Sequence, residues 1–205
     1  PAGPSEVAVV ADRFANPEFV AADLLSQAEH GADSQVICVT DNEELIPQVI
    51  TAVKQQLAEL PRRTIIEKSL ESSRLILVNN LDEALEFINC YAPEHLILQT
   101  QNPEQWADKV INAGSVFLGD FTPESAGDYA SGTNHTLPTN GYARNYSGIS
   151  VDSFVKKITF QQISPAGLKA IAPAIDCMAT TEKLQAHRNA VRIRLEAIEK
   201  GAGRG

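Results

Sequence analysis

A glutamine and a histidine stand three residues apart where a predicted helix gives way to glycine, as Gln27 and His30 in the sequence QAEHG. Residues three apart on a helix share a face, which is the geometry that two ligands of one metal ion require. Glu29 points elsewhere, yet its carboxylate attracts a cation more strongly than a neutral amide does, so the residues alone favour Glu29 over Gln27. A plain helix end with Gly31 as its C-cap is the alternative.

A carboxyl and an imidazole are adjacent in the sequence YAPEHL, as Glu94 and His95 after Pro93. Such a pair can perform general acid–base chemistry, in which one group activates water and the other moves a substrate proton. Adjacent residues of an extended strand face opposite sides, so the two could share a substrate only at a turn or a strand end. The alternative is a Glu-His step on the surface without a function.

Asp128 lies among small residues in the sequence SAGDYASG, which leaves room for a metal or a ligand to approach. One Asp, two His and a carbonyl-type oxygen would form a four-ligand shell that can expand to admit a chelating substrate. An Asx-type turn is the alternative interpretation of Asp128. His135, in SGTNH, and His187, in EKLQAHRNA, are two further candidates, although a lone His is more often a satisfied polar residue than a ligand.

Five short apolar runs along the first 119 residues have the length and the Val, Ile and Leu content of buried strands. Amphipathic helical patterns alternate with them, and Asn16 followed by Pro17 is typical of a helix start. The pattern predicts an α/β fold with a Rossmann-like, mostly parallel sheet flanked by helices. The predicted strands are residues 6–11, 35–40, 74–78, 95–99 and 115–119.

The alternation stops at residues 119–148, which are dense in Gly, Ser, Thr, Asn and Pro. A connection of this length is usually functional, so we expect a long functional loop. A short helix near 151–156, a strand at 157–163 (KITFQQI) and a helical tail at 174–200 are predicted after it. The predicted domains are residues 1–148, with the long loop that carries the candidate metal and ligand residue Asp128, and residues 149–205, with the tail.

The composition excludes several classes of protein. The 205 residues are 43% hydrophobic, and the net charge of −9 without an early basic cluster argues against nucleic acid as a partner. Neither a membrane span nor a secretory signal is present, so a soluble compartment is expected. The three cysteines are expected to be reduced and mostly buried. The chain begins with PAGPSEV and no Met, which indicates that the natural N-terminus is missing, and the dinucleotide fingerprint G-x-G-x-x-G is absent.

Several long motifs together resemble the C-terminal half of histidinol dehydrogenase, the zinc enzyme that completes histidine biosynthesis. They are AGPSEV, ADLLSQAEHGADSQV, YAPEHLILQT, AGSVFLGDFTPESAGDYASGTNHTLPT and LQAHRNAV, and the similarity covers residues 1–199. The resemblance implies the oxidation of L-histidinol to L-histidine through an aldehyde, with two molecules of NAD. It also implies a cytoplasmic protein, or a plastid protein in a plant.

The resemblance assigns roles to matched residues. Glu94 activates the water that attacks the aldehyde, and His95 is the base for the alcohol proton. The implied zinc ligands are Gln27, His30, Asp128 and His187. The implied substrate contacts are Ser5, His135 and Glu182, together with His95 and the zinc ligands.

The resemblance also implies a homodimer in which the tail crosses to the other subunit, so that Glu182 and His187 complete the partner's site. On a single helix these two residues would lie roughly 140° apart around the axis. The family's NAD-binding region lies upstream of this chain, so we expect no more than trace histidinol oxidation from the isolated chain. The alternatives are a non-catalytic interaction or regulatory remnant of the same fold and an unrelated zinc hydrolase.

Overall fold

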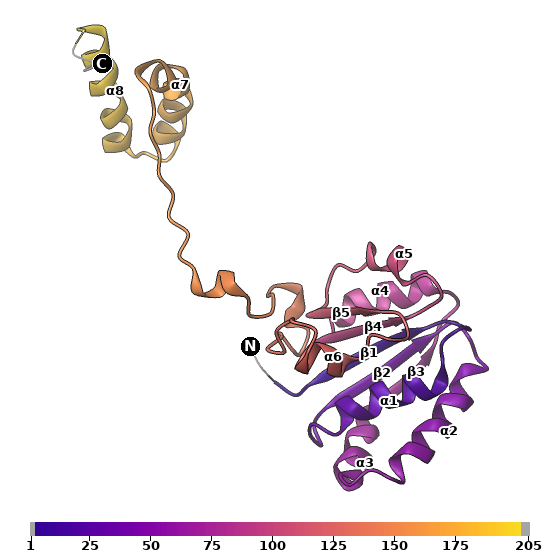
Figure 1. Ribbon diagram of the computed structural model, residues 1–205. Coiled ribbons are helices and arrows are strands. Elements are labelled where there is room, and N and C mark those ends of the chain that lie inside the picture. Colours follow the sequence, from indigo (N-terminus) through magenta and orange to yellow (C-terminus); the bar gives the residue numbers. More distant parts are fainter. Residues whose placement is uncertain (1–2, 202–205) are drawn as a thin grey trace. The chain divides into compact units, whose positions relative to one another are not determined.

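The computed structural model describes residues 3–201, which divide into one compact unit that ends at Val155 and another that begins at Lys156. The first unit contains a five-stranded, all-parallel sheet in the order β3-β2-β1-β4-β5 with helices on its two faces (Figure 1). The predicted α/β fold is therefore confirmed. The strands are β1 (Glu6–Ala11), β2 (Gln35–Thr40), β3 (Arg74–Leu77), β4 (His95–Gln99) and β5 (Ser115–Leu118).

Local signals set where two helices of this unit begin. The side chain of Asn16 accepts a hydrogen bond from the N–H of Glu18, and Pro17 occupies the first helical position, as predicted. Asn80 caps the fourth helix in the same way, by accepting from the N–H of Glu83. The helices are α1 (Pro17–Ala28), α2 (Leu45–Leu57), α3 (Arg63–Ser72), α4 (Leu81–Tyr91), α5 (Pro103–Ala107) and α6 (Glu124–Tyr129).

Two hydrophobic cores lie on opposite faces of the sheet, because successive residues of a strand point to opposite sides. Val7 and Val9 of β1 pack on the side of α1, α2 and α3, whereas Ala8 and Val10 pack on the side of α4. All six residues of β1 are buried. This explains why the strand sequences are continuous apolar runs rather than alternating ones.

The beginnings of β1 and β4 meet at one edge of the sheet. The two strands are parallel neighbours, and Val7 of β1 pairs with His95, the first residue of β4. Helix α1 follows β1 and runs back across the sheet, so its C-terminal end returns to this same edge (Figure 1). Residues that precede or begin these strands are thereby brought beside the end of α1.

The long loop predicted at residues 119–148 is not entirely irregular. It contains α6 and a short 3-10 helix at Tyr142–Arg144. A second 3-10 helix, Val151–Phe154, confirms the short helix expected after the loop. The strand predicted at residues 157–163 is wrong: this segment is exposed and pairs with no strand among the described residues. The alternation of Ile158 and Phe160 with polar residues suits a strand, but a strand is not stable without a partner.

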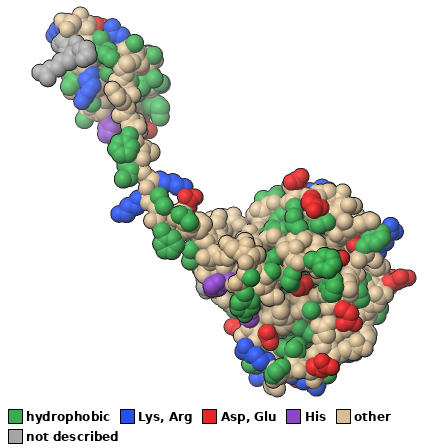
Figure 2. All heavy atoms as spheres, in the orientation of Figure 1, with side chains coloured by type: hydrophobic (Ala, Val, Ile, Leu, Met, Phe, Trp, Pro, Cys, Tyr) green, Lys and Arg blue, Asp and Glu red, His purple; other side chains and the backbone are tan. Residues whose placement is uncertain are grey.

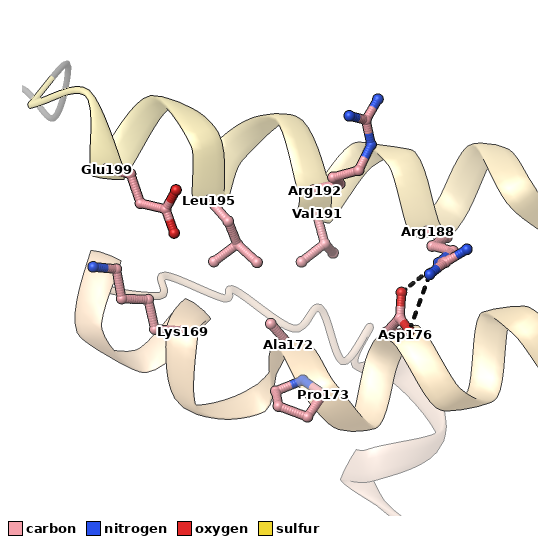
Figure 3. Close-up of a pocket in the computed structure, with 9 residues that line it drawn as sticks. All are labelled: Lys169, Ala172, Pro173, Asp176, Arg188, Val191, Arg192, Leu195 and Glu199. Atoms are coloured by element: carbon pink, nitrogen blue, oxygen red, sulfur yellow. Dashed lines mark hydrogen bonds and ion pairs between the residues drawn. The ribbon is translucent and has the colours of Figure 1, made fainter.

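The second unit is a helical hairpin of α7 (Pro165–Thr181) and α8 (Gln185–Glu199). A pocket lies between the two helices, with the apolar side chains of Ala172, Val191 and Leu195 near its middle and the ion pair of Arg188 with Asp176 at one side (Figure 3). The predicted helical C-terminal tail is therefore confirmed, but it consists of two helices and not of one continuous helix. The chain breaks between the helices, where Lys183 has a positive φ of 61°.

This break corrects the geometry expected for the tail residues. Glu182 caps the end of α7, and His187 belongs to α8. The N–H of Leu184 donates to the carbonyl of Ala179, which closes the turn at Lys183 in the manner of a Schellman motif. The angle of roughly 140° expected between Glu182 and His187 on a single helix therefore does not apply, because the two residues belong to different helices.

The three cysteines are free, but only Cys38 is buried, and burial raises the pKa of its thiol to about 12. Cys90 and Cys177 are exposed, so the expectation that most cysteines are buried is wrong. Acidic side chains are dispersed over the visible face of the first unit (Figure 2). None of the helices within residues 3–201 is long and apolar enough to cross a membrane.

Candidate functional site

Gln27 and His30 meet at the C-terminal end of α1. The helix ends at Ala28 with Glu29 as its C-cap, so Gly31 is not the cap, and His30 lies in the turn that follows. The N–H of His30 donates to the carbonyl of Gln27, which continues the helical path by one more turn. The side chains approach to 2.9 Å between one terminal atom of the Gln27 amide and His30 Nδ1. The spacing therefore brings the two side chains together as predicted.

The Glu94–His95 pair is held by the start of β1. The main-chain N–H of Glu6 donates to Glu94 Oε2 over 3.0 Å, and the main-chain carbonyl of Glu6 lies 3.1 Å from His95 Nδ1. Glu94 immediately precedes β4, and both side chains are buried, with 5% and 3% exposure. The pair lies at a strand end, which is the condition under which both side chains can serve one site.

Helix α6 brings Asp128 to the same place, so Asp128 lies on a short helix rather than in an irregular loop. Asp128 Oδ1 is 3.7 Å from His95 Nε2. One ligand atom from each of His30, Glu124 and Asp128 lies within 4.8 Å of the others. Three segments that are far apart in the sequence thus converge on one cluster of carboxyl and imidazole groups.

Close packing between α6 and β5 permits this approach. A Cβ atom at Gly127 would lie 2.6 Å from Cε1 of Phe117, so only glycine lets the helix come this near to the strand. The Phe117 ring in turn lies 6.0 Å from the His95 ring, measured between centroids. The packing of Gly127 on Phe117 therefore places Asp128 beside His95.

The buried groups have strongly perturbed acidities. Burial, with the neighbouring Glu6 and Asp128 carboxyls, raises the pKa of Glu94 to about 7. Burial and the carboxyls of Asp128, Glu94 and Asp23 raise the pKa of Glu124 to about 9. Burial lowers the pKa of His95. Several carboxyl groups lie close together here and resist ionisation. A bound cation would offset the repulsion between their ionised forms, so the site favours a cation.

Two residues of this site were missed by the sequence reasoning. Glu124 is only 2% exposed and lies four residues before Asp128, so both project from one side of α6. That spacing within PESAGD was the available signal. Glu6 contributes through its main chain, and no side-chain pattern reports such a role.

The remaining predicted residues belong to other segments of the chain. Ser5 is half-buried and lines a pocket together with His30, Asp33 and Ser34. His135 is exposed in the segment after α6. Glu182 and His187 are exposed on the second unit.

Comparisons with known proteins agree along nearly the whole chain. The sequence pattern of the histidinol dehydrogenase family matches residues 1–195. Histidinol dehydrogenase of Bacteroides thetaiotaomicron is 65% identical over 199 residues, which cover 97% of this chain and 46% of that protein. The Yersinia pestis protein of the same name is 55% identical, with 97% and 45% coverage.

A solved structure agrees with the fold. The crystal structure of histidinol dehydrogenase from Elizabethkingia anophelis superimposes with a TM-score of 0.93 at 59% identity, over 97% of this chain and 46% of that one. The chain thus spans about half the length of the relatives that it matches. The chain belongs to the histidinol dehydrogenase family.

Proposed function

We propose that this chain forms the zinc- and substrate-binding part of an enzyme that oxidises L-histidinol to L-histidine through the aldehyde, with two molecules of NAD. The observation that carries the proposal is the contact of the buried Glu94–His95 pair with the cluster around Asp128. Family membership supports the same reaction. It leaves no support for an unrelated zinc hydrolase.

The donor set fits a zinc ion. Zinc in proteins takes imidazole nitrogens and carboxylate oxygens, and both kinds of atom converge here from His30, Glu124 and Asp128. His95 Nε2 is buried and has no hydrogen-bond partner in the described part of the chain, so it faces this space unsatisfied. We assign Gln27, His30, Asp128 and His187 as the ligands. Zinc would act as a Lewis acid without redox chemistry.

The acid–base residues have positions that suit their roles. In the first oxidation, the neutral imidazole of His95 takes the proton of the substrate alcohol while a hydride leaves to NAD. Burial lowers the pKa of His95, which keeps it neutral and able to accept that proton. In the second oxidation, Glu94 takes a proton from the water that adds to the aldehyde, and the hydrate loses a second hydride.

We further assign Ser5, His135 and Glu182 as substrate contacts. Ser5 supports this by lining the pocket that includes His30. Glu182 and His187 lie on the hairpin of α7 and α8, and we propose that this hairpin reaches the site of a second subunit in a homodimer.

Zinc content tests the ligand assignment. We expect the unaltered chain to bind zinc, and Asp128→Ala and His187→Ala each to lose it, as measured by elemental analysis after gel filtration. Glu29→Gln is the matched control, because Glu29 is half-buried beside the site but is not assigned as a ligand. Unchanged zinc content in both alanine variants would reject the assignment. Calorimetry with L-histidinol should then detect binding only to the zinc-loaded chain.

A further inference from the structure

The carboxyl group of Glu124 lies directly against the side-chain amide of Gln27. Its two oxygens are 2.6 and 2.9 Å from one terminal atom of that amide, and the other terminal atom lies 2.9 Å from His30 Nδ1. Gln27 is fully buried and Glu124 nearly so, so neither can turn to water for its hydrogen bonds. One end of the amide thus faces Glu124, with His95 Nδ1 also 3.2 Å away, and the other end faces His30.

The two ends of a carboxamide have almost the same size, so hydrogen bonding decides which end faces which neighbour. The Glu124 carboxylate, which is the form that a bound cation favours, offers only acceptors. It therefore binds the NH₂ group of Gln27, and the carbonyl oxygen is left on the side of His30. With the amide reversed, its oxygen would face two carboxylate oxygens without a hydrogen atom between them.

We propose that Glu124 is the positioning residue of the metal site: it holds the NH₂ group of Gln27 and so turns the carbonyl oxygen of Gln27 toward the bound cation. This inference rests on the proposed function, because it requires Gln27 to be a ligand. An amide binds a cation only through its oxygen, since its nitrogen carries the positive end of the N–H dipoles. A neutral amide can thus serve as a ligand here because a second residue fixes its orientation.

Glu124 also contributes negative charge near the cation, and the two effects can be separated. Glu124→Gln removes the charge and also the selectivity, because the new amide can face Gln27 with either end. Gln27→Glu makes two carboxyl groups face each other without a donor. The double variant Gln27→Glu with Glu124→Gln restores a donor–acceptor pair with the two partners exchanged. If Glu124 positions Gln27, Glu124→Gln should change the zinc affinity in opposite directions in the two backgrounds. If Glu124 acts only through its charge, the substitution should lower the zinc affinity in both.

The experiment measures the zinc affinity of the 205-residue chain by competition with a chromophoric chelator at one fixed pH. We expect Glu124→Gln to weaken zinc binding by about 10- to 100-fold in the native background. In the Gln27→Glu background, the same substitution should strengthen it. Asp23→Asn is the matched control, because Asp23 is a buried carboxyl of the same α1 helix that contacts Gln99 instead of Gln27. Its effect should be less than about threefold.

The outcomes distinguish this inference from the proposed function. If the unaltered chain binds no zinc, both fail. If zinc binds and Glu124→Gln weakens it equally in the two backgrounds, or not at all, only the positioning role is overturned. Far-UV circular dichroism of each variant verifies the fold. A change in the visible spectrum of the cobalt-substituted chain on Glu124→Gln is expected as well, because the ligand atom at Gln27 changes.

Discussion

The main-chain N–H of Glu6 binds Glu94 Oε2 over 3.0 Å, and the carbonyl of the same residue lies 3.1 Å from His95 Nδ1. One peptide segment at the start of β1 therefore holds both members of the proposed acid–base pair. No substitution at position 6 other than proline removes the main-chain N–H, and none removes the carbonyl. The position of the pair depends on the pairing of β1 with β4 and hence on the core of the sheet.

Glu94→Gln should separate the two oxidation steps. The amide cannot take a proton from water, so we expect turnover of the aldehyde to fall by about 10²- to 10⁴-fold and that of the alcohol to fall less. The assay uses a chimera that completes this chain with the remaining part of the Bacteroides thetaiotaomicron relative. Zinc content should not change. Equal losses in both steps would contradict the role assigned to Glu94.

Gly127→Ala should disturb the site through packing. The added Cβ would lie 2.6 Å from the Phe117 ring, so α6 must move away from β5. We expect a loss of about 1–3 kcal/mol in the free energy of unfolding and weaker zinc binding. Ser125→Ala, at an exposed position of the same helix, is the control. Adding Phe117→Leu should recover part of the loss; no recovery would show that the ring contact is not the cause.

Asp23→Asn should change how stability depends on pH. Burial raises the pKa of Asp23 to about 6, whereas an unfolded Asp has a pKa of about 3.9. The stability associated with this group is thus fully present below about pH 4 and is lost as the pH rises through about 6. The free energy of unfolding of the variant should exceed that of the unaltered chain by about 1–3 kcal/mol at pH 7.5, and the two should be almost equal at pH 4.

Urea unfolding at the two pH values checks this prediction. Asn can still accept the hydrogen bond that Gln99 Nε2 donates to Asp23 Oδ2, so the comparison isolates the charge. A stability difference that is the same at both pH values would show that Asp23 has an ordinary pKa.

Lys183→Gly should stabilise the helical hairpin. Lys183 adopts the left-handed conformation, with φ of 61°, at a cost of about 1 kcal/mol that glycine does not incur. We expect the free energy of unfolding to rise by up to about 1 kcal/mol, as measured by urea unfolding followed by far-UV circular dichroism. Lys183→Ala retains the Cβ atom and should show no such gain. Equal effects of the two variants would rule out backbone conformation as the cause.

Features that depend on neighbouring residues were predictable from the sequence. The apolar runs predicted every strand of the sheet, and Asn16 with Pro17 predicted the start of α1. The spacing of Gln27 and His30 predicted that their side chains meet. In each case the structure depends on residues within one or two helical turns or on the strand's own composition.

Features that depend on distant contacts were not predictable. The burial of Glu124 requires α6 to fold back onto α1, and its contact with Gln27 joins segments with no common pattern. The break at Lys183 lacks the glycine that usually marks such a turn. The segment at 157–163 has the pattern of a strand, but the sheet provides no partner for it.

The edge of the sheet at which the site lies has an electrostatic consequence. Sheets of this kind usually bind ligands at the carboxyl ends of their strands, where helices begin and their positive dipole ends attract anions such as phosphate. Here Glu6 and His95 begin their strands, and His30 follows the end of α1. The negative end of the α1 dipole therefore faces the site. Because the site lies at the amino ends of the strands and not at their carboxyl ends, this fold favours a cation here in place of an anion.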